Sequence, residues 1–138
     1  MQIEEFHNHV KPLETLTEGE AVGAVCEARY RQINGWSTVH MFGELLKVSV
    51  NGTQVGSISF DQDDKQKTKT ITLDITKYLT KPENNLQVAL MIDKDYLYKN
   101  ARSEAEFTFH MNGRRIFKKE FETELPAHST INNWAVRL

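Results

Sequence analysis

Two histidines and a glutamate near the start of the chain have the spacing of a metal site. One residue separates His7 from His9, and Glu14 follows five residues later. Two imidazoles and a carboxylate on adjacent strands can converge on one divalent cation. A complete site of this kind needs a third imidazole from a second motif, and no such motif is visible around His110 or His128. Residues 7, 9 and 14 are candidate metal ligands on this pattern alone, and we expect no cofactor.

Three aspartates form a second acidic cluster. Asp61, Asp63 and Asp64 could suggest a calcium loop, but the segment lacks the glycine and the distal glutamate that such a loop requires. A solvated loop explains them better. The sequence also shows no Ser-His-acid arrangement and no glycine-rich phosphate loop, so we expect no catalytic activity.

Basic and aromatic residues gather in one segment near residue 115. Cations beside aromatic rings can stack on bases or hold an acidic partner, and tryptophan and tyrosine rings can stack on a sugar. The alternative is a half-exposed strand with alternating charges. The candidate ligand-binding residues are Trp36, Tyr98, Arg114, Arg115, Phe117, Lys118 and Trp134.

Two Asn-Gly pairs predict the turns that position these residues. Asn51-Gly52 and Asn112-Gly113 each lie between two alternating apolar runs, 61 residues apart in the sequence. Asparagine and glycine both tolerate the positive φ angles of a type I′ turn, so each pair indicates a β-hairpin. Val55 and Phe60 have opposite parity, and a β-bulge at Gly56 would restore one buried face.

A third pair, Asn34-Gly35, predicts another hairpin between residues 21–33 and 36–42. In that hairpin Tyr30 would lie opposite Val39, and Arg29 opposite His40.

Alternating apolar residues predict further strands over residues 71–75, 86–92 and 132–138. With the hairpins, about eight to ten strands and little helix indicate an antiparallel β-sandwich of the jelly-roll type. Residues 1–19 show no sustained period and contain Pro12, so we expect an extended N-terminal arm or edge strand there. Residues 20–138 would then form a single domain.

Composition limits the partners and the location. The 138 residues are 39% hydrophobic and carry a net charge of −2, which argues against nucleic acid and against an anionic membrane. The single cysteine, Cys26, lies among small apolar residues and is expected to be buried. Residues 1–7 have neither the basic nor the apolar part of a secretion signal, and no apolar run reaches the length of a membrane span. A cytoplasmic or virion location is the expectation.

Residues 48–88 resemble the galactose-binding-like jelly roll, and in particular the accessory sugar-binding domain of family 2 glycoside hydrolases. The resemblance is carried by Val48-Ser-Val50-Asn51-Gly52-Thr-Gln-Val55-Gly56, by Leu73-Asp74-Ile75-Thr76-Lys-Tyr78-Leu79 and by Asn84-Asn85-Leu86-Gln-Val88. It implies a sandwich that binds sugar, although the matching residues are structural. Bacterial alpha-2-macroglobulin-like proteins contain β-sandwiches with a similar strand pattern.

We therefore expect a non-catalytic recognition module that binds a glycan or a protein partner through a surface of the sandwich. A first alternative is a structural or partner-binding subunit of a viral or multi-protein assembly, which includes a homo-oligomer, with contacts made by the arm and the sheet edges. A second alternative is a small cupin-like metal-dependent enzyme that uses His7, His9 and Glu14.

Overall fold

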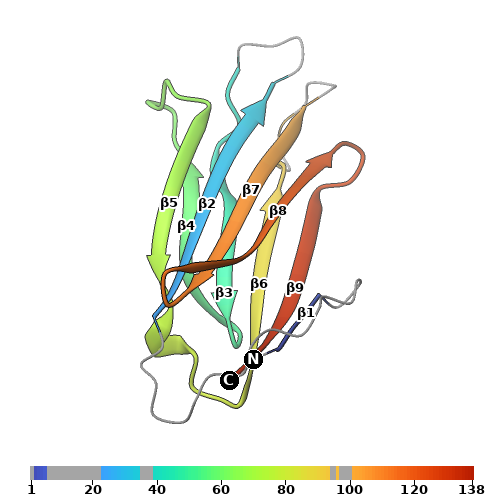
Figure 1. Cartoon of the computed structure of the whole chain (residues 1–138). Helices are drawn as coiled ribbons and strands as arrows, with labels where there is room; N and C mark the ends of the chain where they lie inside the picture. The colour runs from blue at the N-terminus through green and yellow to red at the C-terminus, as the bar shows by residue number, and fades with distance from the viewer. Residues whose placement is uncertain (1, 6–22, 35–38, 94–95, 97–100) are drawn as a thin grey trace.

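The computed structural model describes residues 2–5, 23–34, 39–93, 96 and 101–138 (Figure 1). In this part of the chain almost all regular structure is β-strand, and one 3-10 turn follows the fifth strand. The elements are β1 (Gln2–Glu5), β2 (Ala24–Ile33), β3 (Gly43–Val50), β4 (Thr53–Phe60), β5 (Thr68–Asp74), η1 (Thr76–Tyr78), β6 (Glu83–Met91), β7 (Arg102–Met111), β8 (Arg114–Glu124) and β9 (Ser129–Arg137).

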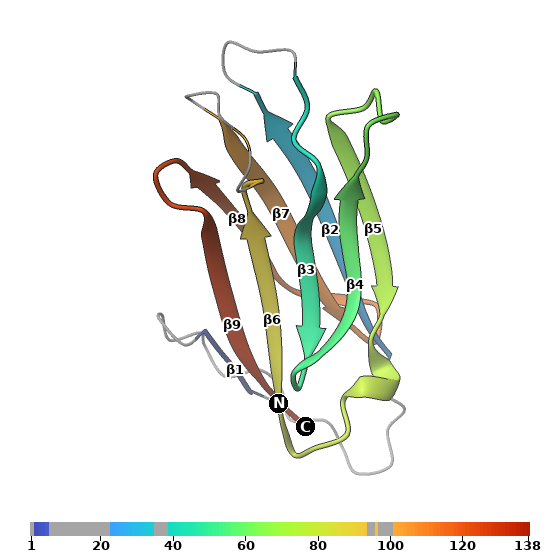
Figure 2. The same cartoon turned by 180° about the vertical axis from the view of Figure 1, so that it is seen from behind.

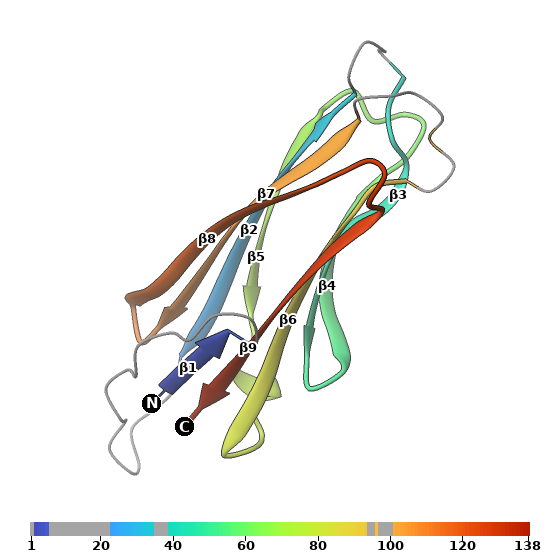
Figure 3. The ribbon, with the colours of Figure 1, turned by 90° about the vertical axis from the view of Figure 1, so that its right-hand side faces the viewer.

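The strands form two antiparallel sheets that stack face to face (Figure 3). The five-stranded sheet has the order β1-β9-β6-β3-β4, and the four-stranded sheet has the order β5-β2-β7-β8. Between β2 and β9, the β3–β4 and β7–β8 hairpins stay within one sheet, and every other connection crosses to the opposite sheet (Figure 2). The predicted antiparallel, jelly-roll-like sandwich is confirmed.

The core lies between the sheets because alternate side chains of each strand point inward. In β6 the inward residues are Leu86, Val88 and Leu90, which are completely buried. Trp134 of β9 stacks on Phe107 of β7, with ring centroids 5.6 Å apart and an angle of 12° between the planes. This contact joins the two sheets, since β9 and β7 belong to different ones.

The two repeated Asn-Gly pairs form the predicted turns. Asn51 and Gly52 have φ angles of 52° and 83°, and Asn112 and Gly113 have 51° and 79°. Positive φ at both central residues is the geometry that a type I′ turn requires. The first turn belongs to the five-stranded sheet and the second to the four-stranded sheet.

Each turn asparagine also binds a neighbouring segment with both its backbone and its side chain. Asn51 N–H donates to the carbonyl of Asn85 at 2.8 Å, and Asn51 Oδ1 accepts the N–H of Asn85 at 2.9 Å. In the second turn, Asn112 N–H donates to the carbonyl of Gly23 and its Oδ1 accepts the N–H of Gly23, both at 2.7 Å. In both turns the carboxamide oxygen acts as the carbonyl of a further ladder partner.

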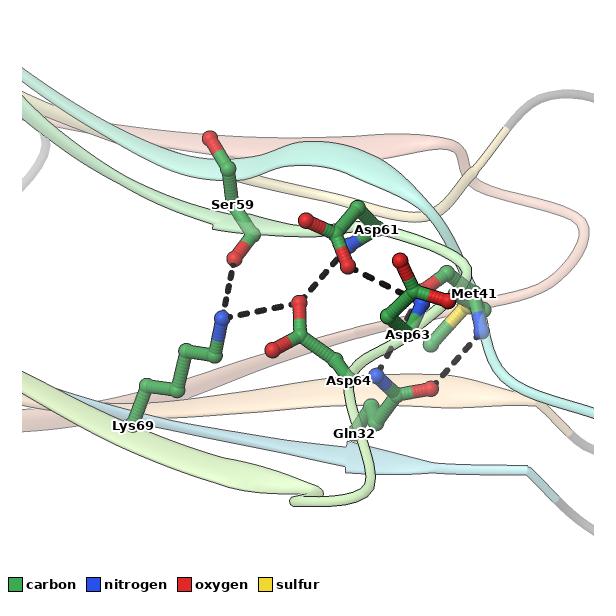
Figure 4. A network of polar contacts seen from close by, with 7 residues as sticks. All are labelled: Gln32, Met41, Ser59, Asp61, Asp63, Asp64 and Lys69. Carbon is green, nitrogen blue, oxygen red and sulfur yellow. Dashed lines mark hydrogen bonds and ion pairs between the residues drawn. The ribbon is translucent and has the colours of Figure 1, made fainter.

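Near the end of β2, the side chain of Gln32 also binds the backbone of another segment (Figure 4). Its completely buried side chain accepts the N–H of Met41 at Oε1, 2.8 Å away, and Nε2 donates to the carbonyl of Met41 at 3.4 Å. The carboxamide therefore satisfies both backbone groups of a residue that lies in no strand.

The predicted bulge at Gly56 is confirmed. The β3–β4 register shifts between Val48 and Ser49, with Gly56 opposite Val48. After the shift both Ile58 and Phe60 are buried in the core. A Cβ atom at Gly56 would lie 2.6 Å from a side-chain atom of Leu73 on β5, which belongs to the opposite sheet, so the glycine also allows the two sheets to approach each other.

The predicted hairpin at Asn34-Gly35 is wrong. The partners of β2 are β5 on one edge and β7 on the other, so Arg29 lies opposite Thr70 and Glu106 rather than His40. Residues 39–42 lie in no strand. A strand has two edges, and both edges of β2 are taken by segments from distant parts of the sequence.

Candidate functional site

The outer face of the four-stranded sheet is charged where β2, β7 and β8 lie side by side. Small or aromatic side chains of these strands, such as Ala28, Tyr30 and Phe107, point into the core. The residues between them point to solvent because the side-chain period of a strand is two. On β2 these outward residues include Arg29 and Arg31.

The strand register aligns six of the outward residues in two rows. One row runs Arg31, Glu104, Glu122 across β2, β7 and β8. The adjacent row runs Arg29, Glu106, Glu120 across the same strands. Each row therefore has one guanidinium group followed by two carboxylates.

The two rows line a groove of about 510 Å³ on this face. Its walls consist of Arg29, Arg31, Glu104, Ala105, Glu106, Glu120, Phe121 and Glu122. Carboxylates accept hydrogen bonds and guanidinium groups donate several in a fixed plane, so the groove can satisfy both functions of a hydroxyl group.

Ion pairs compensate part of the negative charge. Arg102 Nε lies 3.0 Å from Glu104 Oε1 and 3.9 Å from Glu122 Oε2. Lys118 Nζ lies 3.4 Å from Glu106 Oε1. Glu120 has no ion pair with another residue in the described part of the chain.

The groove places like charges directly opposite each other. Glu104 faces Glu122 and Glu106 faces Glu120 on neighbouring strands. Such like-charge pairs directly opposite each other destabilise a sheet. The opposite-charge neighbours Arg31 and Arg29, together with the ion pairs of Arg102 and Lys118, offset part of this repulsion, and Glu120 keeps a carboxylate that no ion pair in the described part of the chain occupies.

The sequence-predicted basic residues lie beside this groove. Lys118 lies opposite Thr108, in the row next to Glu106, and Arg115 lies opposite His110 one row further. Arg114 is exposed at the start of β8. The register thus brings Lys118 and Arg115 to the face that carries the groove, whereas Arg114 lies opposite the buried Met111, and the groove itself consists of other residues.

The two described aromatic candidates, Trp134 and Phe117, do not line the groove. Trp134 is 1% exposed, and its ring centroid is 4.9 Å from that of the half-buried Phe117. Both rings pack in or against the core. Trp36 and Tyr98 lie outside the described residues, as do His7, His9 and Glu14.

Two other reactive side chains are inert core residues. Cys26 is fully buried, and burial raises the pKa of its thiol to about 12, which confirms the expected apolar environment. Tyr30 is also fully buried, and its hydroxyl lies 2.7 Å from Ser103 Oγ. Burial raises the pKa of Tyr30 well above its usual range.

The acidic loop after β4 is held by its own hydrogen bonds (Figure 4). Asp61 N–H donates to Asp64 Oδ2 at 2.7 Å, and Asp63 N–H donates to Asp61 Oδ1 at 3.0 Å. The bond from Asp61 and the ammonium group of Lys69, 3.0 Å from Asp64, hold the pKa of the Asp64 carboxyl below its usual value. Within the described residues, no group of three or more His, Cys, Asp or Glu could hold a metal ion.

The groove residues were missed by sequence reasoning although a local signal exists. Glu104 and Glu106 alternate with buried residues of β7, as Arg29 and Arg31 do in β2. The erroneous hairpin at Asn34-Gly35 assigned β2 a different neighbour. Without the β2–β7 pairing, the arginines and the glutamates have no reason to share a site.

In the part of the chain that the structure describes, no helix is long and apolar enough to cross a membrane.

A family model matches the middle of the chain. The model described as "Cellulose synthase BcsB, first CBM domain", where CBM stands for carbohydrate-binding module, matches residues 44–113, just over half of the chain. The match supports a carbohydrate-binding β-sandwich, as the resemblance implied, but under another family than the sugar-binding domain of family 2 glycoside hydrolases. No curated protein and no solved structure gives a significant match.

Proposed function

The chain belongs to the family of the first carbohydrate-binding module domain of cellulose synthase BcsB, and from this we propose that it is a non-catalytic module that binds a glycan. The proposed site is the groove on the outer face of the four-stranded sheet. Its two rows of one arginine and two glutamates supply donors and acceptors for sugar hydroxyl groups.

The observation that carries the choice of site is the groove itself, whose two rows place guanidinium groups and carboxylates side by side on one face of the sheet. Glu106 and Glu120 face each other although the pairing destabilises the sheet. A bound glycan can use both carboxylates as acceptors, and Arg29 of the same row as a donor.

Titration of the protein with soluble oligosaccharides, followed by calorimetry or by amide chemical shifts, tests the proposal. Cello-oligosaccharides are the first ligands to use, because the family is named after cellulose synthase. We expect saturable binding, and at least a tenfold weaker affinity for the double variant Arg29→Ala, Arg31→Ala, since hydrogen bonds to charged groups contribute about 1.5–3 kcal/mol. Lys65→Ala, at an exposed loop position, is the matched control and should bind as the wild type does.

Two outcomes would contradict the proposal. Wild-type affinity in the arginine double variant would show that the groove is not the glycan-binding site. A protein that binds no oligosaccharide but copurifies in a defined complex would instead support the alternative role as a partner-binding subunit.

A further inference from the structure

The outer face of the five-stranded sheet carries a row of uncharged polar side chains. The register aligns Gln54 of β4, Ser49 of β3, Gln87 of β6 and Asn133 of β9 across four neighbouring strands. With strands about 4.8 Å apart, the row extends over about 14 Å. We call these four residues the amide row.

The amide row has unused hydrogen-bonding capacity. The side chains of Ser49, Gln87 and Asn133 form no hydrogen bond with any other residue that the structure describes, whereas Gln54 Nε2 donates to Glu44 Oε2 at 2.9 Å. Gln54 is exposed and the other three are half-buried. Half-burial restricts a side chain while leaving it accessible, so less conformational entropy is lost when a ligand binds.

The adjacent row on the same face is small or apolar at one end. It runs Ser57, Lys47, Ala89, Ile131 across the same four strands. Ile131 is 45% exposed, which makes it one of the few exposed large apolar side chains of the described residues. A pyranose has hydroxyl groups at its rim and C–H groups on its faces, so polar and apolar rows side by side match both kinds of surface.

Charge separates this face from the groove. The eight residues of the two rows include one charged side chain, Lys47, whereas the two rows of the groove consist entirely of charged residues. A charged partner would find almost no opposite charge along the amide row. An uncharged ligand rich in hydroxyl groups would find complementary donors and acceptors at every strand.

We propose that the amide row is a second glycan site, which binds a linear uncharged polysaccharide lying across β4, β3, β6 and β9. For the class of ligand, the inference rests on the proposed function. The two sheets lie back to back (Figure 3), so this site and the groove face opposite sides of the sandwich and can be occupied at the same time. One molecule can then link two glycan chains.

The experiment compares three proteins in binding to insoluble cellulose and to a neutral soluble oligosaccharide. The first is the wild type, the second is the row variant Gln87→Ala, Asn133→Ala, and the third is the groove variant Arg29→Ala, Arg31→Ala. We expect the row variant to bind neutral glycan at least tenfold more weakly at the amide row, to keep wild-type affinity at the groove, and to retain its thermal unfolding midpoint. Gln62→Ala, in the exposed loop after β4, is the matched control and should change nothing.

A second variant separates the loss of a ligand contact from a loss of structure. Gln87→Glu keeps the size of the side chain but introduces a charge, and it should weaken binding of neutral glycan without changing the unfolding midpoint. Stoichiometry gives an independent measurement, since the wild type should bind two short oligosaccharides per molecule and the row variant one.

The outcomes distinguish this inference from the proposed function. If the groove variant loses glycan binding while the row variant binds with wild-type affinity and stoichiometry, the amide row is not a site and the proposed function stands. If the wild type binds no glycan, both fail. If Gln87→Glu instead blocks a copurifying protein and leaves glycan binding unchanged, the face is a protein interface and the inference is overturned.

Discussion

The two sheets of the sandwich are alike inside and different outside. Each contains one Asn-Gly hairpin, and Asn51 and Asn112 make the same pair of hydrogen bonds to a neighbouring segment. Both sheets bury alternating apolar residues against each other. On the outside, the four-stranded sheet has rows of arginine and glutamate, and the five-stranded sheet has a row of amides and a hydroxyl.

The shared features are those that folding requires. Turn geometry and inward parity determine whether the chain forms hairpins with one apolar face. The outward residues are free of that requirement, so differences between the two outer faces are informative about binding. The following changes test this division, beginning with the largest expected effect.

Removal of the ring that joins the sheets should affect both faces together. Trp134→Ala deletes the contacts to Phe107 and Phe117 and leaves a cavity, so we expect a loss of about 3–5 kcal/mol in the free energy of unfolding, measured in urea. Trp134→Phe should lose less and should keep glycan binding, because the ring is buried. Loss of binding in a folded Trp134→Phe protein would return this residue to the list of ligand contacts.

Substitution of either turn asparagine should lower the free energy of unfolding, and the loss should be larger at Asn51 than at Asn112. Besides the bond from Asn85, Asn51 Nδ2 donates to the carbonyl of Tyr78 at 3.2 Å and to Asn84 Oδ1 at 2.9 Å. We expect Asn51→Ala to cost about 2–4 kcal/mol and Asn112→Ala about 1–2 kcal/mol, as both lose hydrogen bonds and force alanine into positive φ. The glycine variants, which remove the side chain without the backbone strain, should restore part of each loss. Equal losses at the two turns would contradict this ranking.

A charge reversal in the groove should increase stability. Glu120→Lys replaces the like-charge pair with Glu106 by an opposite-charge pair, so we expect a gain of about 0.2–1 kcal/mol in urea unfolding at low salt. The gain should shrink at high salt because exposed charges are screened. Gln87→Lys, on the amide row, should stay within about 0.5 kcal/mol of the wild type. A lower free energy of unfolding for Glu120→Lys than for the wild type would show that the Glu120 carboxylate stabilises the fold.

The smallest change in stability is expected for a substitution at the end of β5. Asp74 Oδ1 accepts hydrogen bonds from Thr76 Oγ1 at 2.6 Å and Thr76 N–H at 3.0 Å, and these bonds lower the pKa of the Asp74 carboxyl. Because the folded-state pKa is lowered, the stabilisation is present above the ordinary value of about 3.9 and disappears as the pH falls through the lowered pKa. Asp74→Asn should therefore be less stable than the wild type at pH 7, and the difference should narrow below about pH 4. A difference that is constant with pH would exclude this carboxylate as its source.

Local patterns in the sequence predicted the architecture well. The Asn51 and Asn112 turns, the bulge at Gly56 and the all-β sandwich follow from residues close together in the chain, and all are confirmed. The third Asn-Gly pair carries the same local signal, yet the strand before it pairs with β5 and β7. Turn chemistry permits a hairpin but does not decide which strands become neighbours.

The candidate sites depend on pairings between distant segments. Arg29 and Glu106 become neighbours only because β2 pairs with β7, and Ser49 and Gln87 only because β3 pairs with β6. The prediction around residue 115 reached the correct face of the sheet because Lys118 lies in the same hairpin as Glu106. The alternation within a single strand predicts which residues point outward, but it does not predict which residues of neighbouring strands lie beside them.

Three backbone amides donate to a side-chain carboxamide where a strand would normally supply the acceptor, and this affects their hydrogen exchange. The amide hydrogens of Gly23, Met41 and Asn85 are held by the carboxamides of Asn112, Gln32 and Asn51 rather than by the backbone of an adjacent strand. For Gly23 and Asn85, exchange with solvent deuterium requires only that an asparagine side chain rotates away, and no strand has to separate from its neighbour. The amides of Gly23 and Asn85 therefore report the motion of single side chains at the sheet ends, on a timescale separate from the opening of the sandwich.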